Sequence, residues 1–162
     1  MNETNMKLLY NALILPLFDY ADVVIDSANA SLKDRLQKLQ NRAGRIILKI
    51  NPYSHVSNKF IHEKLGWDTL QSRRKKHTLT MVYKSLHKLV PSYLTDSFEF
   101  VNSGYILRSI GNLALQRPKT EYCRRMFTYR GSSTYNDISL QIRNGTLYSF
   151  VKNIGKIVPK YI

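Results

Sequence analysis

Hydrophobic residues recur at helical spacing over residues 31–50. They follow one another at intervals of three and four, and the members of this row are Leu32, Leu36, Leu39, Ala43, Ile46 and Ile50. At about 100° per residue, these positions share one side of a helix. Ser31 can cap this helix, and Asn51-Pro52 can end it. The pattern therefore predicts a helix over 31–50 that buries this apolar row in a core.

Three further segments show the same period. Residues 5–20 are mostly apolar, and Pro16 should kink or split a helix there. A short helix is predicted from Ser57 to Leu65 with Gly66 at its end, followed by a longer one over 69–89. A last helix near the C-terminus is predicted from Leu147, Phe150, Val151, Ile154 and Ile157.

The helical period fails between residues 97 and 137. Tyr105–Ser109 and Cys123–Arg130 are the segments there that favour short strands, the second because it is rich in aromatics. The sequence thus predicts a mainly α fold, a helical bundle with a small irregular or β-hairpin segment and a C-terminal helix. We divide it into residues 1–95 and a tail region, 96–162, packed together as one domain, as the length of 162 residues suggests.

Positive charge is concentrated in two parts of the chain. The net charge is +14, residues 33–90 hold fourteen Lys and Arg against three acids, and residues 101–162 hold ten against two. A second row of the helix over 31–50 contains only cations, namely Arg35, Lys38, Arg42, Arg45 and Lys49. The helix over 69–89 places cations opposite its apolar side, among them Arg73, Arg74, Lys84 and Lys88. Such faces favour nucleic acid as the partner, ahead of an anionic membrane or an acidic protein.

Aromatic residues alternate with arginines from Tyr122 to Tyr135. The candidate binding residues of this segment are Arg124, Arg125, Tyr129 and Arg130. Aromatic faces beside guanidinium groups suit the bases and phosphates of a single strand or a hybrid. An equally good interpretation places the aromatics in the core.

Catalytic and metal-binding patterns are absent from the sequence. It has no Asp-Asp dipeptide, Gly-rich phosphate loop or His-Glu-x-x-His motif. Asp19, Asp22 and Asp26 favour a solvated patch or partners for nearby cations over a metal site. His55 and His62 lack a third ligand at plausible spacing. We therefore expect no catalytic residue, no metal and no cofactor.

The sequence favours an intracellular protein, in the nucleus or the cytoplasm. A lone cysteine, Cys123, excludes an internal disulfide and suits a reducing compartment. The longest apolar run, Ala12–Phe18, is too short to span a membrane, and the N-terminal residues do not resemble a secretion signal. We expect no membrane association.

Four segments, in this order, resemble one family. Leu9–Ile25, Leu36–Leu48, Leu65–His77 and Met126–Ile138 are similar to the region after the palm in reverse transcriptases of non-LTR, LINE-type retrotransposons of the Jockey and chicken-repeat kinds. The resemblance runs from about Leu9 to Val158, and departs where such sequences carry Trp, at Ile25 and Tyr135.

This resemblance implies a thumb-like helical region followed by a C-terminal tail. In that family the polymerase aspartates and the endonuclease lie upstream, so the chain would be a non-catalytic fragment of an RNA-directed DNA polymerase. It would hold RNA or an RNA–DNA hybrid through backbone contacts with weak sequence preference, beside the palm and fingers of its parent polymerase. Two alternatives stay open. One is an intact polymerase activity, which needs carboxylates that the sequence lacks; the other is a basic module that binds acidic proteins or anionic surfaces.

Overall fold

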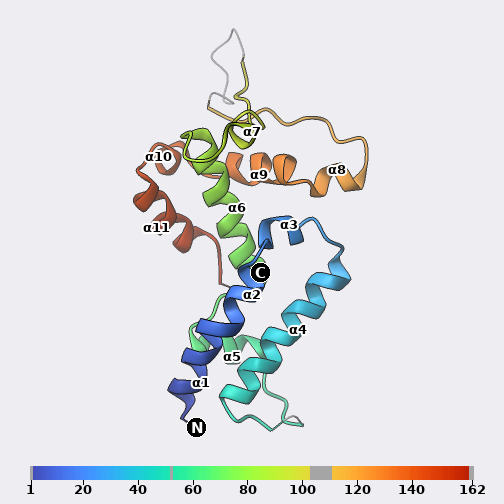
Figure 1. Cartoon of the computed structure of the whole chain (residues 1–162), viewed down its shortest axis with the longest axis vertical. Coiled ribbons are helices and arrows are strands. Elements are labelled where there is room, and N and C mark those ends of the chain that lie inside the picture. Colours follow the sequence, from blue (N-terminus) through green and yellow to red (C-terminus); the bar gives the residue numbers. More distant parts are fainter. Residues whose placement is uncertain (1, 52, 103–110, 161–162) are drawn as a thin grey trace. The chain divides into compact units, whose positions relative to one another are not determined.

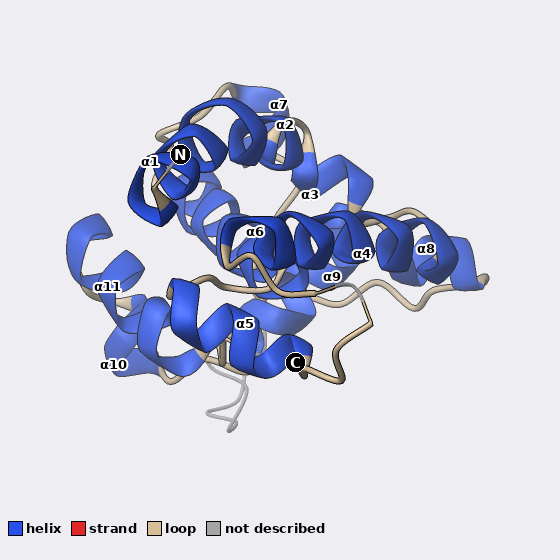
Figure 2. Cartoon of the chain, turned by 90° about the horizontal axis from the view of Figure 1, so that it is seen from below, coloured by secondary structure: helices blue, strands red, loops and turns tan. Residues whose placement is uncertain are grey.

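The structure is a computed structural model that describes residues 2–51, 53–102 and 111–160. All regular elements in these residues are helical, as Figure 2 shows. In chain order they are α1 (Glu3–Leu9), the π-helical η1 (Tyr10–Ile14), α2 (Leu15–Asp19), α3 (Asp22–Ile25), α4 (Ala30–Ile47), α5 (Asn58–Leu65), α6 (Leu70–Leu86), α7 (Ser92–Thr95), α8 (Glu121–Arg125), α9 (Phe127–Asn136), α10 (Leu140–Arg143) and α11 (Leu147–Ile157). The predicted mainly α class is confirmed.

The chain forms two compact units, and the division falls within α6. Unit 1 comprises the residues up to Arg74 together with Pro159 and Lys160, and unit 2 comprises Lys75–Val158. This division lies earlier in the chain than the boundary after residue 95 that the sequence analysis placed between the helical region and the tail. The boundary after residue 95 stays a prediction.

Unit 1 has a small core that includes two stacked aromatic rings. Its buried members are Tyr10, Ile47, Ile61, Leu65 and Trp67. The rings of Tyr10 and Trp67 stack with their centroids 4.1 Å apart. Helix α5 lies against α4 (Figure 1), because Gly44 leaves room for it. A Cβ at Gly44 would come within 2.6 Å of Ile61 Cγ2.

Helix α4 buries a different side from the predicted one. Its buried residues are Gln40, Gly44 and Ile47, whereas Leu32, Leu39 and Ile46 are 47%, 53% and 61% exposed. Gln40 is satisfied in the interior because its amide donates to the Asp68 carbonyl at 3.1 Å. The prediction that the whole apolar row packs inside is therefore wrong, since a small residue and a hydrogen-bonded amide take the central positions.

The helix ends follow local sequence signals. Ser57 caps α5 by accepting from the amide of Phe60 at 3.2 Å, and Gly66 ends that helix with φ +68°. Helix α4 begins one residue earlier than predicted, because Asn29 rather than Ser31 accepts from the amide of Leu32, at 2.9 Å. The π-helical η1 directly precedes α2, which has Pro16 in its first turn, where proline's missing amide costs least.

Unit 2 packs around the second part of α6. Its buried core consists of Leu79, Val82, Tyr83, Phe98, Leu113, Tyr135, Ile138, Phe150, Ile154 and Val158. Phe150 of α11 stacks on Tyr83 of α6 with centroids 4.4 Å apart. Helix α9 approaches α6 through Gly131, where a Cβ would lie 2.7 Å from Val82 Cγ2.

The predicted strand over Cys123–Arg130 is wrong. Thr120 caps α8 by accepting from the Cys123 amide at 3.2 Å, and after an extended Met126 the chain continues as α9. Phe127, Gly131 and Tyr135 recur every fourth residue and so share one side of α9, which packs inward. The other predicted strand, 105–109, lies outside the described residues. Among those described, the only β pairing is an isolated bridge between Phe100 and Leu113.

None of the helices in the described residues is both long enough and apolar enough to cross a lipid bilayer.

Candidate nucleic-acid interface

Four of the five cations predicted along α4 lie on its exposed side. Arg35, Lys38 and Arg42 are exposed on α4 itself, and Lys49 is exposed just after its C-terminal end. None of them forms an ion pair with a described residue. At 1.5 Å per residue, the row from Arg35 to Lys49 is about 20 Å long. It is an uncompensated strip of positive charge on unit 1, which can contact several phosphates of one strand.

A shallow groove borders this strip. It has a volume of about 320 Å³ and is lined by Lys38, Asn41, Arg42, Arg45, Ile46, Ile50 and Asn58. The lining contains three cations and no acid. Charge of one sign around a depression attracts anions, because the low-dielectric walls focus the field.

Arg45, the fifth predicted cation, is half-buried and uses its guanidinium for hydrogen bonds within unit 1. Its guanidinium donates to the carbonyls of Val56 at 2.6 Å and Ser54 at 3.4 Å. These bonds hold the segment between α4 and α5 against the helix. We therefore assign Arg45 a structural role and regard it as a weaker candidate for a phosphate contact.

Lys49 lies two residues after the end of α4, directly after the C-cap residue Leu48. Its φ is +52°, and the amides of Lys49 and Ile50 donate to the carbonyls of Ile46 and Arg45. This is the Schellman arrangement, in which glycine usually occupies the left-handed position. Lys49 adopts a costly backbone conformation while its side chain remains exposed beside the row.

Arg73 and Arg74 are not the free surface cations that the sequence predicted. Arg73 forms a bidentate ion pair with Asp19, with Nε 2.9 Å from Oδ1, and this bond raises the pKa of the guanidinium. Arg74 is buried, and its Nε donates to Asp26 at 3.2 Å. Both pairs tie the start of α6 to residues before α4. These cations already have anionic partners within unit 1, so they are weaker candidates for the predicted phosphate contacts than the exposed cations of α4. Asp19 and Asp26 thus serve as partners of cations.

The two predicted lysines on α6 belong to unit 2. Lys84 is half-buried, and Lys88 is exposed just after the helix. Lys88 follows α6 in the left-handed conformation, with φ +55°, as Lys49 follows α4.

The aromatic segment splits between core and surface. Phe127 contacts Phe98 edge to face at 5.5 Å, and Tyr135 is buried. Tyr129 is half-buried in a pocket that also contains Asp96 and Glu99, and these carboxylates oppose a phosphate there. The prediction of a stacking platform at Tyr129 therefore loses its electrostatic support.

The arginines of this segment have internal interactions. Arg124 lies 3.8 Å from Glu121, and both side chains are well exposed, so this pair contributes little. Arg125 Nε donates to the Glu121 carbonyl at 3.4 Å, and Arg130 is half-buried on α9. They remain weaker candidates than the α4 row.

Arg143, a cation that the sequence analysis did not identify as important, connects several segments of unit 2 by hydrogen bonds. Arg143 is 5% exposed and donates to the carbonyls of Ile138 and Gly111 at 2.6 and 2.9 Å. Its guanidinium also lies 5.1 Å from the centroid of the Tyr135 ring. Burial lowers the pKa of Arg143. No local sequence signal distinguishes it from a surface arginine, because its partners are mostly backbone carbonyls.

Comparisons of the chain with protein-family models, with curated proteins and with solved structures found no match. The resemblance to non-LTR reverse transcriptases therefore stays a hypothesis.

Proposed function

We propose that the chain is a nucleic-acid-binding fragment with no catalytic activity of its own, derived from the C-terminal part of a non-LTR RNA-directed DNA polymerase. In this proposal α4 holds an RNA duplex or an RNA–DNA hybrid by its backbone inside the cell, in the nucleus or the cytoplasm. The main support is the exposed row of Arg35, Lys38, Arg42 and Lys49, which no described acid neutralises.

The chemistry of this row suits sequence-independent binding. Lysine and arginine contact phosphate oxygens, which carry no base information, and release condensed counterions when they do so. A duplex carries one charge per about 1.7 Å of its axis, so a strip about 20 Å long meets more phosphates than it has cations. The contacts then depend on charge spacing and not on sequence.

A second exposed surface supports attachment to a larger protein. Exposed apolar residues occur along α1, η1 and α2, among them Leu9, Leu13 and Leu17. A contiguous apolar patch on a soluble protein commonly marks a protein interface. The palm of a parent polymerase is the partner that we propose for it.

A different function is favoured by another observation on α4. Leu32, Leu39 and Ile46 are exposed beside the cations. An exposed helix side with apolar and cationic rows also suits an anionic membrane surface or an acidic amphipathic helix. The same strip could thus serve a basic interaction module with no selected role in nucleic-acid binding.

Binding by matched variants separates these functions. We expect Arg35→Gln/Arg42→Gln to weaken binding to an RNA–DNA hybrid at least tenfold, and equally for unrelated sequences. The matched control, Lys152→Gln/Lys156→Gln, removes the same charge from exposed positions on α11 and should change affinity about twofold or less. Equal losses from both pairs would mean that the net charge acts diffusely and would contradict the α4 interface.

Vesicles containing phosphatidylserine provide a second test, which separates nucleic-acid binding from membrane-surface binding. The proposal predicts binding to the hybrid that excess vesicles do not displace. Tighter binding to vesicles, lost on replacing Leu39 and Ile46 by Ser, would instead support the membrane-surface function. Primer extension by the purified chain with Mg²⁺, at any measurable rate, would contradict the absence of catalytic activity.

A further inference from the structure

The shallow groove beside α4 contains a hydrogen-bonding side chain whose orientation the fold determines. Asn41 is half-buried in the lining of this groove. Its Oδ1 lies 3.0 Å from Gln37 Nε2 and 2.7 Å from His62 Nε2. A carboxamide has an acceptor at one end and two donor hydrogens at the other, so its orientation decides which of them the groove offers to a ligand.

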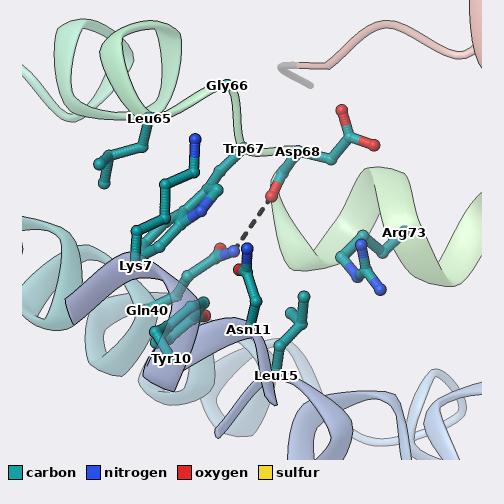
Figure 3. A pocket seen from close by; sticks show the side chains of 10 residues that line it. All are labelled: Lys7, Tyr10, Asn11, Leu15, Gln40, Leu65, Gly66, Trp67, Asp68 and Arg73. Carbon is teal, nitrogen blue, oxygen red and sulfur yellow. Dashed lines mark hydrogen bonds between the residues drawn. The ribbon is translucent and has the colours of Figure 1, made fainter. Parts of the chain in front are cut away.

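A row of hydrogen bonds within unit 1 sets that orientation, and it begins at a backbone amide, which can only donate. The amide of Leu70 donates to Gln37 Oε1 at 2.9 Å, so the NH₂ group of Gln37 points the other way. Its two hydrogens go to Gln40 Oε1 at 2.8 Å and to Asn41 Oδ1. The NH₂ group of Gln40 in turn donates to the Asp68 carbonyl, the dashed line in Figure 3. Asn41 therefore turns its oxygen toward Gln37.

The other end of Asn41 is a donor that no described residue uses. Because Asn41 Oδ1 accepts, His62 must donate to it from Nε2. Burial lowers the pKa of His62, against a smaller opposite effect of the Trp67 backbone, so near pH 7 the ring is neutral and carries one hydrogen, at Nε2. The NH₂ group of Asn41 forms no hydrogen bond with a described residue and is left to face the groove. Two accepted bonds thus hold a neutral donor at a fixed position beside the α4 cations.

The polar groups of the groove match a phosphate. Lys38 and Arg42 lie in the lining with Asn41, are exposed, and form no ion pair with a described residue. All three side chains offer donors, and phosphate oxygens only accept, whereas the edges of nucleic-acid bases carry donors as well. A carboxylate also accepts, but a tetrahedral phosphate can meet donors that converge from several directions. Asn58, the first residue of α5, lines the groove too, at a helix end that favours an anion.

We propose that this groove binds one phosphate group of the nucleic acid held by α4, with Asn41 as a directional donor and Lys38 and Arg42 as the source of charge. The inference rests on the proposed function and narrows it, because contact with the α4 row through charge spacing alone needs no such fixed point. An internal phosphodiester and a phosphate at a strand end offer the same oxygens and differ in their position along the strand.

The tautomer of His62 tests the orientation of Asn41 without any substitution. In a long-range ¹H–¹⁵N correlation spectrum at neutral pH, we expect His62 Nε2 to carry the hydrogen and Nδ1 to have the chemical shift of an unprotonated ring nitrogen. The opposite tautomer would mean that Asn41 donates to His62 and presents its oxygen to the groove. That result would overturn the proposal, because the groove would then offer an acceptor to the phosphate.

Inorganic phosphate is the simplest probe of the groove. Its titration into the full chain should shift the side-chain ¹H–¹⁵N signals of Asn41 saturably, with a dissociation constant of about 1–10 mM. Acetate at equal ionic strength should produce less than about a tenth of the shift, because it is planar and carries less charge. An equal response to acetate would mean that the groove attracts any anion, and the phosphate site would be refuted.

Asn41→Asp keeps the oxygen that accepts from Gln37 and His62 and replaces only the NH₂ group that faces the groove. We expect it to abolish the phosphate response, followed at the backbone amide of Asn58, and to weaken binding of an RNA–DNA hybrid at least about tenfold, since a hydrogen bond to a charged group is lost. Asn5→Asp makes the same charge change on α1, outside the groove, and should weaken hybrid binding about twofold or less. Circular dichroism should show the parent fold for both variants. Equal losses from the two would leave Asn41 no role beyond net charge and would contradict the proposal.

The hybrid itself identifies which phosphate is bound. If a hybrid with 5′-phosphates binds the parent chain more tightly than one with 5′-hydroxyls, and Asn41→Asp removes the difference, a terminal phosphate occupies the groove. If the two hybrids bind alike and Asn41→Asp weakens both, an internal phosphodiester occupies it.

Arg35→Gln separates the groove from the longer interface, because Arg35 lies on α4 outside the lining. It should weaken hybrid binding and leave the phosphate response intact. An unchanged hybrid affinity with an intact phosphate response would contradict the α4 interface alone. An absent phosphate response in the parent chain, with normal hybrid binding, would overturn only the groove.

Discussion

Replacing Arg74 by methionine should destabilise unit 1 strongly. Arg74 and Asp26 are each 5% exposed, and Arg74 Nε lies 3.2 Å from Asp26 Oδ1. Removal of one partner from a buried ion pair costs about 3–5 kcal/mol. That is a large part of the about 5–15 kcal/mol that stabilises a typical domain. If Arg74 instead contacted phosphates from the surface, its loss would change stability by less than about 0.5 kcal/mol.

Urea unfolding followed by Trp67 fluorescence is the suitable assay, since this single tryptophan lies in unit 1. With a slope of about 1–3 kcal/mol per molar urea, the expected loss moves the midpoint down by about 2 M. Arg42→Met is the matched control, because Arg42 is exposed on the same unit, and its midpoint should stay near that of the parent chain. The double variant Arg74→Met/Asp26→Asn should lose less than Arg74→Met alone, since it also removes the buried charge of Asp26. Equal midpoints for Arg74→Met and Arg42→Met would refute the assignment.

Three further predictions concern particular backbone and side-chain positions. Gly44→Ala should lower the free energy of unfolding by about 1–3 kcal/mol, because the new Cβ would lie 2.6 Å from Ile61 Cγ2. Gly155→Ala in unit 2 has open space around it and should be neutral or stabilising, with unfolding of both variants followed by circular dichroism. Burial lowers the pKa of His62, so as the pH falls the unfolded chain binds a proton before the folded chain does. The free energy of unfolding should therefore be highest above about pH 6.5 and should fall below that pH, by at most about 1.4 kcal/mol per pH unit for this one proton. His62→Gln should flatten that part of the curve of stability against pH. Lys49→Gly should raise the free energy of unfolding by up to about 1 kcal/mol, since φ is +52° there, while weakening hybrid binding; a loss of stability would mean that the lysine side chain contributes to the fold.

Local signals were sufficient to predict α4, α5, α6 and α11. The spacing of Leu79, Val82 and Leu86 and the caps at Ser57 and Gly66 act within a few residues, so the sequence alone indicates the helices that they belong to. The prediction for Cys123–Arg130 was wrong because its run of aromatics suits a strand as well as a helix, and the decisive contact of Gly131 with Val82 comes from another helix.

The orientation of α4 could not be predicted from its hydrophobic pattern. Six apolar residues mark one side, yet the side that packs carries Gln40 and Gly44, because α5 needs a close approach and the Asp68 carbonyl needs a donor. The same limit applies to Arg73 and Arg74. Their partners lie 54 and 48 residues away, so nothing in the local charge pattern distinguishes them from the exposed Arg35.

The salt dependence of hybrid binding tests the proposed α4 interface most directly. If Arg35, Lys38, Arg42 and Lys49 each replace a counterion, the logarithm of the binding constant should fall against the logarithm of salt concentration with a slope of about −3 to −4. The Arg35→Gln/Arg42→Gln variant should flatten that slope by about two, and Lys152→Gln/Lys156→Gln should leave it unchanged. A slope that is the same in the parent chain and the α4 variant would contradict the interface.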